Sequence, residues 1–440
     1  MNIINKTTKK RKNNRFSLGY IFLWKLILDM VYVFVITKEY AHWNMGLNFS
    51  FYKYISSFLI IVLLSIPIRK LQYDNTSSSI IIEFLSLAYF FPGCTLYAFN
   101  NLNNTFFIYL VAYWSLLLLF YYRMPKFNLS LFKFDTAMKS GFFYTLFFGI
   151  AITSLLLIAR YSGLRFSLSL DDAYVWRRQL KGFEIPGIFN YIRVWSVIIV
   201  PIGIGYFWIM KKYILSILLI FLQVFQYGFD GYRSTLLYLF VTIAVLIFYN
   251  EEKRRLIPIA FISTGIFTLG EYLFRSKSFL ANLLYFRSLL IPPLYGSYYM
   301  DFFSNHELDF LRTSILRRFG FVSPYANYAG FKDYTYLIGN IYNSSLEENA
   351  NTGILGDAFA NFGWASLLFY PFLVMILLKV LDYCTEDLDH KIKMIICFLV
   401  FVALTNGSLF QVLLTNGFLI ICILSVLMKK NISLKTNKLN

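Results

Sequence analysis

Charged residues are scarce in this sequence of 440 residues: they make up 15% of it, while hydrophobic residues make up 58%. Soluble domains carry about 25% charged residues and about 45–50% apolar ones. A chain with so few charges lacks the polar surface to cover a soluble core, and the same composition excludes charge-driven disorder and collagen. The composition therefore predicts a protein that crosses a membrane many times.

Cysteines and the short catalytic motifs are equally sparse. The four cysteines show no metal-ligand spacing, and three of them lie in apolar runs, so we expect small hydrophobic residues inside helices. A nucleotide-phosphate loop, GxSxG, HExxH and CxxC are all missing, which argues against a pump or an enzyme that consumes nucleoside triphosphates. The three histidines, His42, His306 and His390, are too scattered for a metal site, and none is predicted.

Long apolar runs are abundant. A membrane-spanning helix needs about 20 mostly apolar residues, and about twelve segments satisfy this rule. We therefore predict an all-α, polytopic integral membrane protein. A membrane bundle of about nine helices would occupy residues 1–273, a long outer segment 274–351, and about three helices with a cytoplasmic tail 352–440. The predicted spans cover roughly residues 16–38, 51–68, 79–99, 104–122, 141–160, 188–209, 213–229, 232–249, 256–273, 352–378, 392–408 and 409–428.

Lysine and arginine collect in alternate connections between these spans. With the N-terminus inside, every predicted inner loop carries at least two basic residues, which agrees with the positive-inside rule. Both termini are then predicted to be cytoplasmic. This topology accounts for the net charge of +18, which therefore does not indicate a nucleic-acid partner.

Two predicted outer segments, residues 160–187 and 274–351, are rich in arginine. Topology accepts lysine or arginine equally, whereas a planar guanidinium is preferred where phosphate or carboxylate is gripped by two hydrogen bonds. The pattern predicts an outer anionic ligand with phosphate as the leading candidate; solvated arginines beside lipid headgroups are the alternative. The arginines at or beyond the outer face are Arg160, Arg165, Arg177, Arg178, Arg193, Arg233, Arg275, Arg287, Arg312, Arg317 and Arg318.

A tight turn from Gly228 to Arg233 joins two predicted spans. It places Asp230 and Arg233 at membrane depth or at the outer edge, where ionisable residues are costly and are usually functional or paired. Two interpretations follow. The two residues pair with each other, or Arg233 faces an outer cavity and binds a phosphate.

The outer segment 274–351 is dense in aromatic residues, among them Tyr298 and Tyr299. This density suits an interfacial helix or a platform for sugar rings. The segment also contains His306 and several carboxylates able to accept a proton from a hydroxyl group, which the sequence does not rank. These carboxylates are Asp301, Glu307, Asp309 and Asp333.

A run of small and polar residues opens the predicted span at 352–378. Asn351 or Thr352 is expected to cap the helix. Asp357 then lies in the first two turns, and Asn361 lies one turn further along the same face. Polar residues stacked in this way at the outer end of a span are expected to face a cavity. Close helix packing through the neighbouring glycines is the alternative.

These segments resemble the Wzy family, the oligosaccharide repeat-unit polymerases of O-antigen and capsule assembly. The resemblance covers most of the chain. It is strongest in the segments Phe286–Phe303, Asn351–Gly353 and Gly356–Gly363, and it extends to Thr405–Phe410 and Leu413–Gly417.

The resemblance implies a helical enzyme of GT-C-like architecture in the bacterial inner membrane, with a large periplasmic loop. Its substrates would be oligosaccharides linked by diphosphate to undecaprenol, and the growing chain would pass to a sugar hydroxyl of the next unit. The implied chemistry requires no cofactor, nucleotide sugar or metal. Membrane lipids, a flippase and a chain-length regulator are the expected partners.

This reaction assigns expected roles to particular side chains. The leaving diphosphate needs a positive clamp, because charge builds there as the glycosidic bond breaks, and the attacking hydroxyl needs a base or acceptor. The expected diphosphate-binding residues are Arg177, Arg178, Arg233 and Arg287, the candidate bases are Asp357, Asp230 and Asp172, and the expected glycan contacts are Tyr298, Tyr299, Asn351, Asn361 and His306.

Three other functions remain open on the sequence. A related O-antigen ligase would share the topology and rely on an outer histidine, a part that falls to His306 in this chain. A flippase would also have about twelve spans, but it would show two similar halves and short loops, and residues 1–220 and 221–440 show no repeat. The third alternative is a scaffold component of the assembly machinery without catalysis.

Overall fold

The structure is a computed structural model that describes residues 18–128, 136–166, 172–250, 254–331, 333–344 and 348–436. Every regular element within these ranges is helical, which confirms the predicted all-α class. Short 3₁₀- or π-helical stretches, labelled η, interrupt several of the helices. The first helical tract, Leu18–Glu39, contains η1 (Tyr32–Ile36) and α2 (Thr37–Glu39). The elements that follow are η2 (Ala41–Trp43), α3 (Phe51–Leu71), α4 (Ser77–Leu85), η3 (Ser86–Phe90), α5 (Phe91–Ala98), α6 (Asn104–Arg123), α7 (Thr136–Ser162), α8 (Ala173–Lys181), α9 (Gly187–Ile209), α10 (Tyr213–Asp230), α11 (Arg233–Phe248), α12 (Leu256–Arg275), η5 (Ala281–Leu290), α13 (Ile291–Asn305), η6 (Leu316–Phe319), η7 (Tyr328–Gly330), α14 (Tyr334–Asn343), α15 (Gly353–Phe362), η8 (Gly363–Ala365), α16 (Ser366–Thr385), α17 (His390–Asn406), η9 (Gln411–Thr415) and α18 (Phe418–Thr436).

Nine of the described helices are long and apolar enough to cross a membrane. Each predicted span overlaps a described helix, but some of these helices are short. The 16 residues of α11, for example, rise about 24 Å, against a hydrocarbon core of about 30 Å. The chain is therefore a polytopic helical membrane protein, and its twelve crossings stay a prediction.

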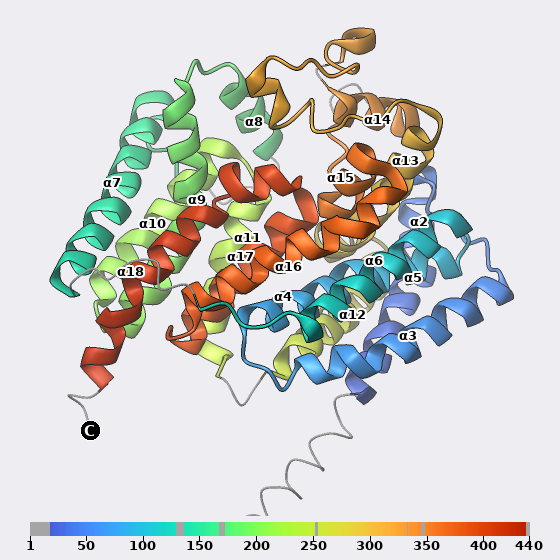
Figure 1. Ribbon diagram of the computed structural model, residues 1–440, viewed down its shortest axis with the longest axis horizontal. Helices are drawn as coiled ribbons and strands as arrows, with labels where there is room; N and C mark the ends of the chain where they lie inside the picture. Colours follow the sequence, from blue (N-terminus) through green and yellow to red (C-terminus); the bar gives the residue numbers. More distant parts are fainter. Residues whose placement is uncertain are drawn as a thin grey trace, which may run out of the picture.

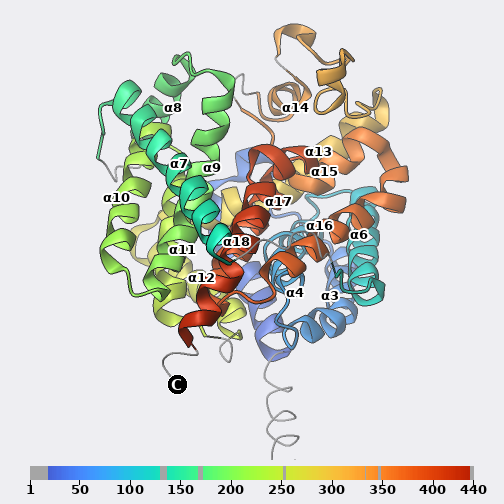
Figure 2. The same cartoon turned by 60° about the vertical axis from the view of Figure 1, so that its left-hand side comes forward.

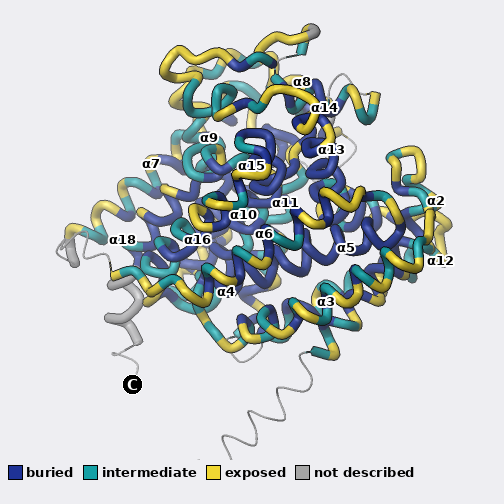
Figure 3. The backbone as a smooth tube through the Cα atoms, turned by 45° about the vertical axis from the view of Figure 1, so that its right-hand side comes forward, coloured by how far each residue is buried: buried dark blue, intermediate teal, exposed yellow. Residues whose placement is uncertain are grey.

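The helices form a buried centre and an apolar periphery. In the most apolar 18 residues of Ser77–Ala98, formed by α4, η3 and α5, 100% of the residues are buried, whereas in the corresponding parts of α3 and α12 the share is 22% and 28%. A helix that is apolar on all sides belongs in an interior, and one that exposes large apolar side chains suits contact with lipid. Figure 3 shows α5 as a continuous buried tube and α3 as one in which exposed and intermediate residues alternate. The burial pattern thus distinguishes the core from the lipid-facing layer.

Two groups of helices flank the C-terminal helices α17 and α18. Figure 2 shows α7, α9, α10 and α11 on one side, and α3, α4, α6 and α16 on the other. Between them, α17 packs against both α4 and α9. Figure 1 shows α8, α13 and α14 gathered at one end of the bundle. The segment 274–351, predicted as a long outer loop, thus contains α13, which packs against α15 and α5 and is mostly buried.

Several connections predicted to be inner meet at a common end of the bundle. Arg254, before α12, forms an ion pair with Glu83 of α4 (Nε–Oε2 3.0 Å) and donates to the backbone carbonyl of Asp74. Tyr121, near the end of α6, donates to the Asp74 carboxylate. The predicted alternation of loops between two ends is therefore compatible with the packing, although the side that each end faces stays a prediction.

A buried ion pair lies inside the first helical tract. Lys25 Nζ lies 2.5 Å from Asp29 Oδ1, and Thr95 of α5 bonds to both residues at 2.7 Å. Lys25 is 1% exposed. Charges at such depth survive when they are paired and fully hydrogen-bonded. This network fastens the first tract to the central α5.

The cysteines occupy the predicted kind of environment. Cys94, Cys384, Cys397 and Cys422 are all buried, and none of the four forms a disulfide. They contribute to the hydrophobic core. Their prediction as small hydrophobic residues is confirmed.

Candidate functional site

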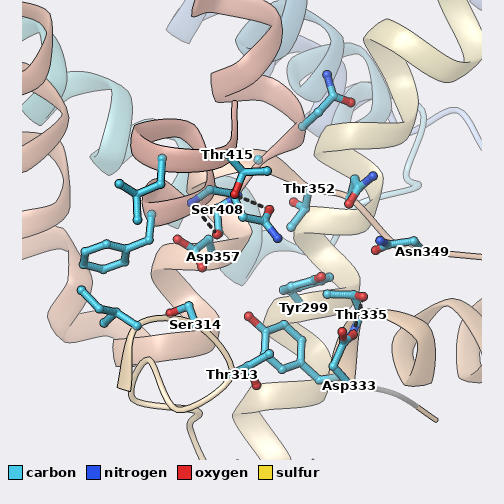
Figure 4. Close-up of a pocket in the computed structure, with 18 of the residues that line it drawn as sticks. Tyr299, Thr313, Ser314, Asp333, Thr335, Asn349, Thr352, Asp357, Ser408 and Thr415 are labelled. Carbon is cyan, nitrogen blue, oxygen red and sulfur yellow. Dashed lines mark hydrogen bonds between the residues drawn. The ribbon is translucent and has the colours of Figure 1, made fainter. Parts of the chain in front are cut away.

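A polar cavity of about 240 Å³ opens among α13, α14, α15 and the chain after α17. Its walls combine segments far apart in the sequence, and most of the lining side chains are hydroxyls, amides or carboxylates (Figure 4). Such a surface fits a ligand that offers many hydrogen-bonding groups. The lining residues are Tyr299, Thr313, Ser314, Ile315, Arg318, Asp333, Tyr334, Thr335, Asn349, Asn351, Thr352, Gly353, Asp357, Asn406, Ser408, Phe410, Gln411, Leu414 and Thr415.

Asp357 is the buried carboxylate of this wall. Its Oδ2 atom accepts from the Leu409 amide at 2.9 Å and from the Tyr370 hydroxyl at 3.1 Å, and its Oδ1 accepts from Asn361 Nδ2 at 2.9 Å. A carboxylate offers about four lone-pair sites, so these three donors occupy most of its capacity. Asp357 therefore holds α15, α16 and the segment after α17 together, with little acceptor capacity left for a ligand.

Asn361 lies one turn beyond Asp357, as predicted, and its side-chain amide bonds to two different segments. Its Nδ2 donates to Asp357, and its Oδ1 accepts from the Leu311 amide at 2.6 Å. The chain around Leu311 is folded further by Asp309, which accepts from Thr313 N and Oγ1, both at 2.8 Å. Asn361 thus links the cavity wall to the segment that carries Thr313, Ser314 and Arg318. It does not itself line the cavity.

The first residue of α15 is a glycine for a steric reason. Gly353 has φ +70°, and a Cβ atom there would lie 2.5 Å from the Leu404 carbonyl oxygen and 2.6 Å from that of Thr405. No L side chain fits such an approach without displacing backbone. The N-terminus of α15 therefore abuts the C-terminal turn of α17 at the cavity. Thr352 is the N-cap residue, one of the two that the sequence predicts.

Tyr299 and Asp333 form another part of the wall. Tyr299 is buried and donates to the Ala350 carbonyl at 2.8 Å. Burial, with the Asp333 and Asp357 carboxylates nearby, raises the pKa of Tyr299 well above its ordinary value, so the phenol stays a hydrogen-bond donor. Asp333 caps α14 by accepting from Thr335 N at 3.0 Å and Thr335 Oγ1 at 2.5 Å. Both residues are thus held in place at the cavity (Figure 4).

Arginines gather beside the cavity, around the turn between α10 and α11. Arg177 of α8 donates from Nε to the Gly231 carbonyl at 3.0 Å, and its guanidinium lies 5.1 Å from the ring centre of Tyr232. The buried Asp230 accepts from Tyr232 N at 2.8 Å and from the Thr235 hydroxyl. Arg177 and Arg193 are both close enough to Asp230 to act on it electrostatically. We call Arg177, Arg193 and Arg233 the arginine cluster, because all three surround this turn.

The arginine cluster and the cavity are neighbours. Arg318, which lines the cavity, donates to the hydroxyl of Tyr191 on α9 at 2.8 Å. Tyr191 lies two residues before Arg193 in the same helix. Trp195, also on α9, donates to the Leu414 carbonyl at 2.7 Å. Tyr336 of α14 interacts electrostatically with both Asp333 and Tyr232. The start of α9 therefore contacts the cavity wall and also carries Arg193 of the arginine cluster.

The other predicted site residues lie elsewhere. Arg178 and Asp172, on and just before α8, are exposed. Tyr298 is stacked on Tyr342 with ring centres 4.3 Å apart, so the protein covers one face of its ring. His306 is exposed but stacks on Phe302 at 4.1 Å. Arg287 acts electrostatically on Glu348 and Tyr295, away from the arginine cluster.

The structure therefore divides the predicted set. It brings Asp357, Asn361, Tyr299 and Asn351 to the cavity region, and it brings Asp230, Arg177 and Arg233 to the turn. The sequence places Arg193, Arg318 and Asp333 among the outer residues but does not assign them to the site. The helical spacing of Tyr191, Arg193 and Trp195 on α9 gives no indication of Arg318. Arg318 contacts Tyr191 from a position more than a hundred residues away in the sequence.

In the described part of the chain, no three His, Cys, Asp or Glu side chains are grouped so that they could hold a metal ion. Comparisons of the sequence and the structure with protein-family models, with curated proteins and with solved structures found no match. The function therefore has to be inferred from the cavity and the arginine cluster themselves.

Proposed function

We propose that this protein is a membrane glycosyltransferase that polymerises diphosphate-linked oligosaccharide repeat units, as its resemblance to Wzy polymerases implies. One observation carries the proposal: a cavity lined with hydroxyls, amides and carboxylates adjoins a cluster of three arginines at one end of an apolar helical bundle. Such a pair of sites suits a ligand with an uncharged polar part and an anionic part. A lipid-linked oligosaccharide has both, together with a tail for the membrane.

The reaction divides between the two sites. A hydroxyl of the incoming unit attacks the anomeric carbon of the growing chain, the bond from that carbon to the diphosphate oxygen breaks, and the hydroxyl proton leaves. Negative charge grows on the departing diphosphate, so Arg177, Arg193 and Arg233 would stabilise it most in the transition state. Two substrates anchored in one membrane are already concentrated in a plane, which favours their encounter.

The carboxylates have unequal prospects as the proton acceptor. The carboxylate oxygens of Asp357 and Asp230 accept hydrogen bonds from protein donors. Asp172 is exposed. All three remain proposed bases, with Asp357 the one at the cavity. The outer face of a bacterial inner membrane, with both termini cytoplasmic, is the proposed location, and no cofactor enters the proposed chemistry.

Polymerisation in vitro tests the proposal. Purified protein is mixed with a defined undecaprenyl-diphosphate repeat unit, and a gel displays any ladder of products. Arg177→Ala and Arg193→Ala are each expected to slow ladder formation about 100-fold or more, since removing one well-placed donor commonly has that effect. Lys181→Ala, on the exposed surface of the same α8, is the matched control and is expected to leave the ladder intact.

Three results would contradict the proposal. Ladders of normal length and rate from both arginine variants would show that these arginines do not stabilise the departing diphosphate. A single product on a lipid A core acceptor, without a ladder, would indicate a ligase. Movement of the same lipid across proteoliposome membranes without any glycan transfer would indicate transport.

A further inference from the structure

The charges around the cavity point to a discrimination among sugars that the polymerase proposal does not contain. We propose that the cavity accepts sugar residues that carry no carboxylate or phosphate, and that it excludes acidic sugars. The inference rests on the proposed function for the view that the cavity holds the glycan. It concerns the charge of the sugar that lies at the cavity.

The walls carry more negative than positive charge. Among the described residues that line the cavity, Asp333 and Asp357 are acidic and Arg318 is basic. Asp309 lies directly behind this wall, 1% exposed, and acts electrostatically on Tyr334 together with Asp357. A third carboxylate therefore adds to the negative potential inside. Like charges brought together at a binding surface oppose association strongly.

The positive features of the cavity are few. Arg318 is its basic residue among those described, and one of its guanidinium nitrogens donates to the Tyr191 hydroxyl of α9. The N-terminus of α14 would attract an anion, but the Asp333 side chain caps it by accepting from Thr335 N. A helix N-terminus that is capped by a carboxylate no longer offers its positive end to a ligand. Among the described residues that line the cavity, an acidic sugar would therefore meet two carboxylates against a single guanidinium.

Uncharged groups, by contrast, are abundant on the walls. Asn349 and Asn351 present amides that donate and accept, and Ser408 presents a hydroxyl that can do both. The hydroxyls of Thr313, Ser314 and Thr335 donate to protein oxygens, so they offer acceptor oxygens to a ligand. Sugar hydroxyls also donate and accept, so each matches several of these groups. The Asp333 carboxylate, being acceptor-only when ionised, suits a hydroxyl hydrogen in the same way.

Phosphate is directed elsewhere by the same reasoning. The arginine cluster surrounds the α10–α11 turn, and its three residues do not line the cavity. The negative cavity and the positive cluster thus sort the two parts of one substrate by charge.

Saturation-transfer NMR with purified protein in detergent tests the inference. The probes are two matched pairs: methyl glucoside with methyl glucuronide, and methyl galactoside with methyl galacturonide. Members of each pair differ only at C6, where the uronide has a carboxylate. We expect at least one neutral glycoside to bind roughly tenfold or more tightly than its uronide, since a like-charge contact has that magnitude or more.

Variants connect the effect to the cavity. Asp333→Asn is expected to narrow the difference between neutral and acidic probes by strengthening uronide binding. Asp301→Asn is the control, because Asp301 is an exposed carboxylate that bonds to Tyr342 and does not line the cavity. It is expected to leave the difference unchanged.

Equal or tighter binding of the uronides, no binding of either neutral glycoside, or the same response in both variants would overturn the inference. These outcomes are separable from the polymerase proposal, because the probes carry no diphosphate and no transfer is measured. A ladder built readily from a repeat unit whose sugars are all acidic would support the polymerase proposal and contradict the sugar selectivity. Selective glycoside binding without any ladder would support the sugar selectivity and contradict the polymerase proposal.

Discussion

Replacing Asn361 by leucine should loosen the segment that carries Thr313, Ser314 and Arg318, while leaving the bundle folded. The side chain is 1% exposed and joins two structures: it accepts from the Leu311 amide at 2.6 Å and donates to Asp357 at 2.9 Å. Leucine has a similar size but forms neither bond. The substitution therefore removes the link without opening a large cavity.

The magnitude follows from these two bonds. Leaving a buried donor unsatisfied costs about 1–3 kcal/mol, an upper range for the partly buried Leu311 amide, and a hydrogen bond to a charged group contributes about 1.5–3 kcal/mol. The segment is also strained, because Phe310 and Leu311 have φ values of 49° and 64°, a region that bulky residues rarely occupy. A net loss of about 3 kcal/mol in the local opening free energy corresponds to roughly 100-fold faster exchange.

Hydrogen exchange with mass spectrometry measures this opening directly. Peptides covering residues 309–318 should exchange roughly 100-fold faster in Asn361→Leu, while peptides from α14 serve as the internal reference. Asn406→Leu is the matched control, since Asn406 lines the same cavity but is exposed and bonds within its own helix to Val402 and Thr405. Its exchange at 309–318 should match the parent protein.

Asn361→Asp separates the two contacts. Aspartate keeps an acceptor for the Leu311 amide but places a second carboxylate against Asp357, so the segment should again open faster. Unchanged protection of 309–318 in Asn361→Leu, in protein whose overall thermal stability is normal, would refute the reasoning. It would mean that Asp309 and its own bonds hold the segment alone.

The remaining predictions concern the supports of the site and of the bundle. Gly353→Ala should lower thermal stability in detergent by about 2 kcal/mol or more, because its Cβ would meet the Leu404 carbonyl at 2.5 Å with φ at +70°; Gly149→Ala, which has open space, should be close to neutral, and equal effects would contradict the steric account. Lys25→Met should destabilise by about 3–5 kcal/mol because it leaves the Asp29 carboxylate buried without its cation, whereas the double change Lys25→Met with Asp29→Leu should recover most of the loss. A denaturation series on the two single variants and the double variant checks this, and additive losses would show that the pair is not coupled.

Much of the architecture was accessible from local pattern. Apolar runs of span length correspond to helices. Thr352, one of the two cap residues that the sequence predicts, occupies the N-cap position of α15, but its hydroxyl donates to the Pro292 carbonyl and makes no bond to the helix. Asn361 bonds to Asp357 because residues four apart share a helix face. The segment 274–351 was less accessible, because its aromatic density fits an interfacial helix as well as the buried α13 that the structure shows.

The sequence by itself determined that this protein is helical, apolar and suited to a membrane, because helix periodicity and span length are properties of neighbouring residues. Tertiary structure alone decided which polar groups share the cavity. Asp357 meets the Leu409 amide and Asn361 meets the Leu311 amide across 52 and 50 positions of chain, and Arg318 meets Tyr191 across 127. Contacts at such separations depend on how each helix is rotated and how each loop closes, and no local periodicity encodes those choices.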